Sequence, residues 1–369
     1  MQGAGPSRYY RPELDVLRFF AFFMVFLSHV VPGDEAFFGQ LHVPPAVAHL
    51  LIGMAAGGAF GVDLFFALSS FLITTLLLRE HNERASIGVA SFYARRILRI
   101  WPLYFAFLFI VVPLAQRVLP GDNMPVKYIA AFALLSGNWA CVAWGYPHSV
   151  AGPLWSVSIE EQFYLSWPLV MRLWIRHLAV IAFALLALSF ATRLYLVYHG
   201  AEHPQIWCNT LARLDPIACG ALLAVFACRR DLALTSWQRI GLLLVGEAVL
   251  IAAGRYGDFV GSRALIVYPA VAAACTALIL GTLNLQVSNR PVLRALMYLG
   301  RISYGLYVFH YMFIMMFDVT SAHEPRDRGA RTALALLATI ATAVASYWFL
   351  ETPFLRLKQI FTRVESRPI

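Results

Sequence analysis

Residues 178–198 read LAVIAFALLALSFATRLYLVY, and Arg193 is the one charged side chain among these 21 residues. As an α-helix, a segment of this length rises about 30 Å, which is the thickness of the hydrocarbon core of a bilayer. Backbone groups at that depth find no water, so a single segment crosses as a helix, whose hydrogen bonds are internal. The stretch therefore predicts a transmembrane helix and a membrane fold.

The composition of the whole chain agrees with this prediction. Hydrophobic residues make up 60% of the 369 positions and charged residues 13%, whereas soluble proteins average roughly 45–50% and about 25%. Apolar segments near spanning length recur from end to end, which leaves no room for a separate soluble domain. We predict an all-α polytopic membrane protein with a single domain at 1–369, comprising a core at about 10–354 and a short cytoplasmic tail at 355–369.

Charge and cysteine content exclude other classes of protein. The net charge is +9, but the basic residues lie between hydrophobic segments, where they orient a membrane protein, so we do not expect nucleic-acid binding. The five cysteines show no metal or redox spacing, so we expect no metal site. The first apolar segment carries Asp15 and Arg18, and no small-residue cleavage site follows it. It therefore predicts a retained helix and not a signal peptide.

Eleven apolar segments are candidate transmembrane helices. They lie at about 14–31, 58–78, 98–119, 128–144, 160–176, 178–198, 208–228, 238–254, 264–284, 299–318 and 331–350.

The positive-inside rule tests whether all eleven cross. If they do, with the N-terminus inside, the 29 Lys and Arg residues divide 15 inside and 14 outside, which is no bias. If 128–144 enters and leaves on the outer side, the same residues divide 20 inside and 9 outside. Ser136, Gly137 and Asn138 also interrupt that segment. We therefore predict about ten transmembrane helices, one re-entrant or interfacial segment, and both termini in the cytoplasm.

The first helix carries a stripe of polar residues. Asp15, Arg18 and His29 fall on one helical face, and His29 lies about 16 Å beyond Arg18 along the axis. Ionisable residues inside a membrane are costly and are functional candidates. The alternative is an interfacial Asp15–Arg18 pair with His29 at a helix end.

Arginines gather on the inner side, at the start of the third helix. Arg95, Arg96 and Arg99 lie there, and guanidinium groups bind phosphate bidentately. Such a cluster favours an anionic, phosphorylated ligand at the membrane surface. Ordinary positive-inside anchoring is the alternative.

The predicted topology gathers charged residues near the outer end of the first helix, where His29 emerges. They are Asp63, Glu160, Glu161, Arg213 and Asp215. A carboxylate beside a histidine orients the imidazole and makes it a better base. Structural ion pairs are the alternative, above all Arg213 with Asp215. His310 lies at mid-depth in the tenth helix near Tyr304, where it is either functional or a core histidine bonded to a tyrosine.

Several strings together resemble the membrane-bound acyltransferase-3 family, from about residue 10 to residue 354. The strings are RPELDVLRFFAFFMVFLSH at 11–29, FGVDLFFALSSFLIT at 60–74, RRILRIWPLY at 95–104, GPLWSVSIEEQFYLSWP at 152–168, RLDPIACGALLA at 213–224, RISYGLYVFH at 301–310 and ETPF at 351–354. Their order and spacing make the combination specific.

The resemblance implies roles for particular residues. The family's arginine and histidine of the first helix fall on Arg18 and His29, its paired arginines on Arg96 and Arg99, and its glutamate on Glu160, which follows Trp155 and Ser156. One departure is Ser70, where the family usually has glycine. Some members carry a fused SGNH esterase-like domain, but this chain ends about 15 residues after the last motif, so we expect a stand-alone acyltransferase.

The resemblance implies transfer of an acyl group, most often acetyl, from acyl-CoA to a hydroxyl. We expect the CoA phosphates to bind Arg95, Arg96 and Arg99 from the cytoplasm, with Arg18 close by. The pantetheine arm then reaches His29, which acts as general base or as acyl carrier, oriented by Glu160 or Asp63. Seven further residues are expected to bind the acceptor or to support the site: Trp155, Ser156, Glu161, Arg213, Asp215, His310 and Tyr304.

The acceptor implied by the family is a carbohydrate-type molecule, and the position of His29 favours an outward-facing glycan. We expect acyl-CoA as the co-substrate, no permanently bound cofactor, and a multi-pass protein of the bacterial cytoplasmic membrane. The alternative from another class is a transporter that uses the buried charges as a substrate or ion pathway. Its support is weaker because no internal two-fold repeat is visible.

Overall fold

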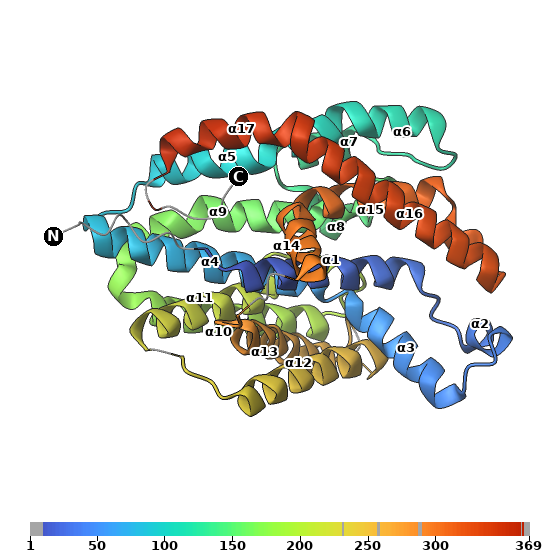
Figure 1. Ribbon diagram of the computed structural model, residues 1–369, viewed down its shortest axis with the longest axis horizontal. Helices are drawn as coiled ribbons and strands as arrows, with labels where there is room; N and C mark the ends of the chain where they lie inside the picture. The colour runs from blue at the N-terminus through green and yellow to red at the C-terminus, as the bar shows by residue number, and fades with distance from the viewer. Residues whose placement is uncertain (1–9, 231, 257–258, 287–289, 363, 365–369) are drawn as a thin grey trace.

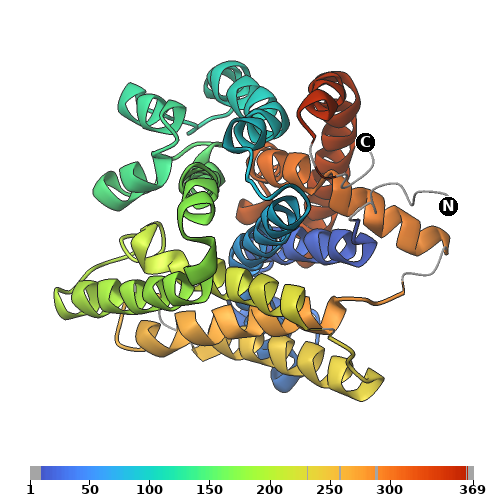
Figure 2. The same ribbon diagram turned by 90° about the vertical axis from the view of Figure 1, so that its left-hand side faces the viewer.

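The computed structural model describes residues 10–230, 232–256, 259–286, 290–362 and 364. This part of the chain is helical and holds no strand; one isolated bridge joins Asn123 to His148. Most of the long helices run along the long axis of the molecule (Figure 1), and a view along that axis shows them packed side by side as a bundle (Figure 2). The all-α prediction is confirmed.

The long helices follow the predicted segments. They are α1 (Pro12–Val30), α4 (Gly61–Arg84), α5 (Val89–Ala106) with α6 (Val112–Val118), α9 (Trp155–Trp174), α10 (Leu178–Tyr198), α11 (Leu214–Arg229), α12 (Ser236–Tyr256), α13 (Ala264–Thr282), α15 (Ser303–Met316) and α16 (Pro325–Ser346) with α17 (Thr352–Lys358). Shorter helices are α2 (Glu35–Gln40), α3 (Pro45–Gly58), α7 (Val126–Ala133), α8 (Gly137–Trp144) and α14 (Pro291–Arg301). No predicted segment covers α2 or α3, and α14 lies mostly ahead of the predicted segment at 299–318.

Seven helical stretches of the described residues are long and apolar enough to cross a membrane. The stretch Gly152–Tyr198 holds both α9 and α10, joined by a short 3₁₀ turn. Two further predicted spans are not among the seven: α1, which carries Glu13, Asp15 and Arg18, and α15, which has 14 residues. Seven candidates are therefore established by length and composition, and the count of ten remains a prediction.

The segment predicted to be interrupted at 128–144 consists of two helices. α7 and α8 have eight residues each, so each rises about 12 Å, far less than a bilayer core. Between them Leu135 has a φ of 56°, in the left-handed region that ends a helix. The segment does not form one continuous span.

Two of the long helices widen for one turn before a proline. Phe107–Val111 forms a π-helical turn ahead of Pro113, and Tyr347–Glu351 forms one ahead of Pro353. Proline lacks an N–H and its ring crowds the carbonyl four residues earlier. A wider turn relieves that clash and lets the helix continue, so α5 with α6 and α16 with α17 each act as one long element.

Close packing of α4 against α11 forms part of the core. Gly220 of α11 lies against the Ala67 carbonyl of α4, where a Cβ atom would overlap it. Ser70, which stands where the family usually has glycine, is fully buried and donates a hydrogen bond to the Ile217 carbonyl at 2.6 Å. The hydroxyl therefore bonds the two helices together, as small polar residues do in membrane bundles.

Candidate active site

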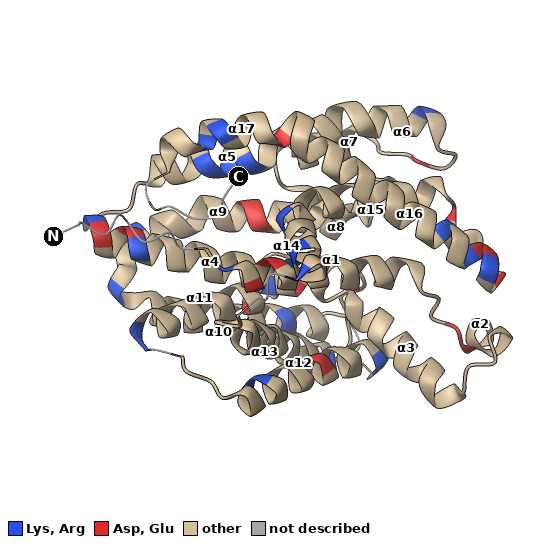
Figure 3. Cartoon of the chain, in the orientation of Figure 1, with Lys and Arg blue, Asp and Glu red and all other residues tan. Residues whose placement is uncertain are grey.

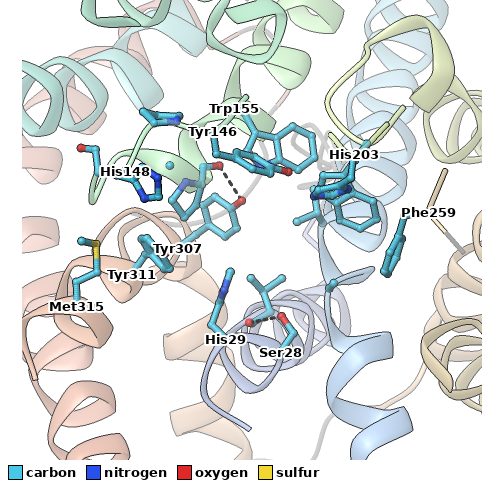
Figure 4. A pocket seen from close by; sticks show the side chains of 18 of the residues that line it. Ser28, His29, Tyr146, His148, Trp155, His203, Phe259, Tyr307, Tyr311 and Met315 are labelled. Atoms are coloured by element: carbon cyan, nitrogen blue, oxygen red, sulfur yellow. Dashed lines mark hydrogen bonds between the residues drawn. The ribbon is translucent and has the colours of Figure 1, made fainter. Parts of the chain in front are cut away.

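His29 lies near the end of α1 and lines a cavity of about 520 Å³, here called the outer cavity. Its walls come from α1, α15, the 3₁₀ turn at Gly152–Leu154 and the loops around 120, 146–149 and 203–207. The His29 side chain points into this space, with Tyr311 and Tyr307 on one side and Trp155 and His203 across from it (Figure 4). The imidazole of His29, the predicted base, is therefore accessible from the outer cavity.

No Asp, Glu, Lys or Arg is among the described residues that line the outer cavity. The rings nearest His29 belong to α15: the ring centre of His310 is 5.4 Å away and that of Tyr311 is 5.2 Å away. His310 is fully buried, and its Nδ1 lies 2.5 Å from the Tyr307 carbonyl oxygen. One ring nitrogen of His310 is therefore bonded to the backbone of a tyrosine, which agrees in part with the core-histidine alternative. The ring also lies next to the ring of His29.

Aromatic side chains form the far wall of the outer cavity. Trp207 lies 6.0 Å from Trp155 and 5.1 Å from Phe259, between ring centres. Burial lowers the pKa of the His203 imidazole, and the positive charge of Arg213 lowers it further, so His203 is neutral at pH 7. Burial also raises the pKa of the Tyr146 hydroxyl above its usual value. The wall is therefore uncharged.

Ser156 and Tyr307 tie α9 to α15 at the inner edge of this cavity. Their hydroxyl oxygens are 2.7 Å apart, and the Tyr307 hydroxyl donates to the Pro153 carbonyl at 3.0 Å (Figure 4). Tyr307 and Val62 also line a second, narrower cavity of about 80 Å³, here called the middle cavity. The two cavities are thus neighbours that share these side chains.

The middle cavity holds the carboxylate that was expected beside His29. Glu160 lines it together with Arg18, Arg96 and Arg99, and its Oε1 accepts a hydrogen bond from Ser69 at 2.8 Å. Glu160 does not line the outer cavity. Residue 160 lies five positions after Trp155 on α9, which places it more than one helical turn from the cavity wall at Gly152–Trp155. This corrects the expectation that Glu160 orients His29.

A third cavity of about 110 Å³, here called the inner cavity, lies beside the middle one. Arg18, Arg96 and Arg99 line both. The other charged residues of the inner wall are Arg11, Arg95, Lys358, Asp15 and Glu80. Figure 3 shows the basic positions of α5 and α17 close together. Within the described residues, no carboxylate oxygen lies within 4 Å of the charged nitrogens of Arg18, Arg96, Arg99 or Lys358, whereas Arg95 pairs with Glu80 at 3.5 Å.

Two pairs of buried charges line none of the three cavities, although the Arg213 guanidinium lies 4.1 Å from the centre of the Trp207 ring in the wall of the outer one. Asp63 pairs with Arg213 at 2.6 Å, and Asp215 pairs with Arg193. All four side chains are buried. The ion-pair alternative is therefore the one observed, with different partners from the expected Arg213–Asp215 pair. The Asp63 carboxylate binds the Arg213 guanidinium and not His29, which corrects the expectation that Asp63 orients His29.

Two further predicted residues support the walls. Glu161 accepts a hydrogen bond from the Trp101 indole at 3.0 Å, so it faces α5 and not the outer cavity. Tyr304 lines the middle cavity and donates to the Ile100 carbonyl at 3.1 Å.

Loops and the C-terminal helix contribute further cavity-lining residues that no sequence motif marks. Lys358 was assigned to a tail, and Tyr146, His148, His203 and Trp207 were not singled out. Loop residues carry no helical periodicity. The one available signal was the concentration of His, Tyr and Trp in polar connections between spans.

Comparison with known proteins supplies the family. The model of the acyltransferase domain known as acyltransferase 3 matches residues 11–351. Peptidoglycan O-acetyltransferase OatA of Listeria monocytogenes is 28% identical over 333 residues, which are 83% of this chain and 52% of that protein. O-acetyltransferase OatA of Staphylococcus aureus is 26% identical over 338 residues, 83% of this chain and 54% of that protein.

A putative O-acetyltransferase of Staphylococcus aureus, SACOL0978, is 28% identical over 340 residues, 84% of this chain and 54% of that protein. The chain thus spans about half the length of these relatives. No solved structure matches. The family match covers nearly the whole helical bundle, including the helices that carry Arg18, Arg96, Glu160 and His29. The chain is a member of the acyltransferase-3 family, and its seven described helical stretches of spanning length and composition make it a multi-pass membrane protein.

Proposed function

We propose that the protein transfers an acetyl group from acetyl-CoA, bound from the cytoplasm, to a hydroxyl of a glycan at the outer face of the membrane. The observation that carries this proposal is the row of three cavities that share walls. Arg18, Arg96 and Arg99 belong to both the inner and the middle cavity, and Val62 and Tyr307 belong to both the middle and the outer one. A thin, extended donor fits such a path.

The basic end of the path suits the phosphates of CoA. Arg18, Arg96, Arg99 and Lys358 converge there. Asp15 and Glu80 share the wall, but within the described residues no carboxylate oxygen lies within 4 Å of these four basic groups. Guanidinium binds phosphate in bidentate fashion. Arg18 and His29 are eleven positions apart on α1, a rise of about 16 Å. The pantetheine arm of CoA would cover that distance and bring the thioester to the imidazole.

At the outer end, His29 takes the proton from the acceptor hydroxyl. The hydroxyl oxygen then bonds to the thioester carbonyl carbon, the C–S bond breaks, and the proton passes from His29 to the leaving thiolate. In the second version a His29 nitrogen bonds to the thioester carbonyl carbon, the C–S bond breaks, and CoA leaves as the thiol with the imidazole's proton. The glycan hydroxyl then takes the acetyl group and gives its proton back to His29. Labelled acetyl-CoA without acceptor distinguishes the two, because only the second version leaves an acyl-imidazole on the peptide that contains His29.

The glycan acceptor is proposed from two observations. The Listeria relative is named a peptidoglycan O-acetyltransferase, and the outer cavity presents an uncharged aromatic wall. Aromatic faces suit the apolar faces of sugar rings. A transporter has no support from the relatives. The topology proposed with this function is ten crossings, both termini in the cytoplasm, and α7 and α8 on the outer side, in a bacterial cytoplasmic membrane.

The test is release of free CoA from acetyl-CoA by the purified protein in nanodiscs, with a chitooligosaccharide as the acceptor probe and mass spectrometry of the product. We expect His29→Ala to abolish glycan acetylation. His199→Ala is the matched control, since His199 is exposed and lines none of the three cavities. Wild-type rates in His29→Ala would remove His29 from the mechanism, and acetyl-CoA left intact with every glycan tried would contradict the proposed function.

A further inference from the structure

His310 holds an unusual buried nitrogen. The side chain is fully buried in α15, and its Nδ1 lies 2.5 Å from the carbonyl oxygen of Tyr307. A carbonyl oxygen only accepts, so Nδ1 carries the hydrogen and Nε2 of the neutral ring carries a lone pair. Within the described part of the chain this Nε2 has no hydrogen-bond partner. Buried acceptors without a partner are rare and call for an explanation.

The polar rings nearest His310 are those of His29 and Tyr307, each 5.4 Å away between ring centres, and the Tyr307 hydroxyl already donates to the Pro153 carbonyl. An N–H···N bond of about 3 Å between two imidazoles places their ring centres roughly 5 Å apart. The observed separation of the His29 and His310 ring centres is 5.4 Å, with the planes tilted by 40°. The described residues give the His29 ring no hydrogen bond of its own, and no carboxylate lines its cavity. The ring separation is therefore close to that of a hydrogen-bonded pair of imidazoles.

We propose that His310 is the positioning residue for His29: its Nε2 accepts the N–H of one His29 nitrogen and so fixes the other nitrogen, with its lone pair, toward the outer cavity. The inference rests on the proposed function of His29. Histidine bases are usually held in one tautomer by a carboxylate or carbonyl acceptor. Here both candidate carboxylates are bound elsewhere, Glu160 to Ser69 and Asp63 to Arg213.

The proton balance of the reaction is simple under this arrangement. The cavity-facing nitrogen of His29 takes the hydroxyl proton, which makes an imidazolium whose second N–H stays bonded to His310. That nitrogen then returns the proton to the CoA thiolate. His310 remains neutral throughout and keeps its own hydrogen bond to Tyr307. A neutral acceptor spares the buried site a permanent negative charge, which is costly in the apolar surroundings of Phe22 and Tyr311.

Two variants of His310 separate this role from packing. His310→Asn keeps an amide N–H near the position of Nδ1, for the Tyr307 carbonyl, and removes any acceptor at the position of Nε2. His310→Gln places an amide oxygen near the position of Nε2. The readout is the rate at which diethylpyrocarbonate modifies His29, followed by peptide mass spectrometry. His203, which lines the same cavity, is the internal reference.

We expect His310→Asn to lower the ratio of His29 to His203 modification rates on the order of tenfold, and His310→Gln to restore part of it. The kcat of glycan acetylation should follow the same order while the KM for acetyl-CoA stays unchanged. An unchanged modification ratio in His310→Asn would overturn the inference. If the wild-type protein acetylates no glycan but the ratio still falls in His310→Asn, the proposed function fails and the His29–His310 bond stands.

Discussion

Arg18 and His29 lie on the same helix, α1, but line different cavities: Arg18 faces the inner and middle cavities and His29 faces the outer one. Helix geometry fixes the separation of the two residues at about 16 Å. In the proposed mechanism, one rigid helix therefore carries both a charge that binds the donor and the base that acts on the acceptor.

The first prediction concerns binding of the donor. Arg99→Gln should weaken CoA binding roughly tenfold, because one charge-assisted phosphate contact is lost. Lys358→Gln should have a smaller effect, since an ammonium group binds phosphate as a point charge. Isothermal titration of CoA into the purified protein measures both. The control is Arg172→Gln, because Arg172 is an exposed arginine in the last turn of α9 that lines none of the cavities. Equal CoA affinities for the wild type and all three variants would contradict CoA binding at the inner cavity.

The second prediction concerns the buried pair Asp63–Arg213. Asp63→Asn should destabilise the protein by about 3–5 kcal/mol, because it leaves the Arg213 guanidinium buried without its counter-ion. The double variant Asp63→Leu with Arg213→Met should recover much of that loss, since neither buried charge remains. Thermal denaturation in detergent measures the change. Full stability of Asp63→Asn alone would show that the pair contributes nothing to folding.

The third prediction concerns topology. Cys228 at the end of α11 is exposed, and Cys141, Cys208 and Cys275 are buried. A membrane-impermeant maleimide should therefore label Cys228 in inside-out vesicles and not in intact spheroplasts. In a Cys228→Ser background, Ser262→Cys, at an exposed position shortly before α13, should show the opposite pattern. Labelling of both positions from the same side would contradict the proposed orientation.

Much of the fold follows from the sequence because one physical rule governs it. Apolar length marks the spans, as at 178–198 and 264–284, and the structure has α10 and α13 there. The break in 128–144 was also visible, because Ser136, Gly137 and Asn138 interrupt its apolar run. The helix α3 was missed because its 14 residues are too few to span.

The sequence predicts the positions of some site residues correctly but not the neighbours of others. Arg18, Arg96 and Arg99 do converge, as their shared depth on α1 and α5 suggested. Depth does not fix which way a side chain points, however. Glu160 faces the arginines, Asp63 faces Arg213, and the neighbour of His29 comes from α15, far away in the chain. Rotation of each helix about its axis is set by packing, which periodicity alone does not determine.

The most direct test of the cavity path uses sided proteoliposomes. Labelled acetyl-CoA is enclosed with the cytoplasmic face of the protein inside, and a chitooligosaccharide is supplied outside. The path predicts labelled acetyl on the external glycan and free CoA retained in the lumen, with neither in His29→Ala. Acetylation that occurs only when glycan and acetyl-CoA share one side of the membrane would contradict it.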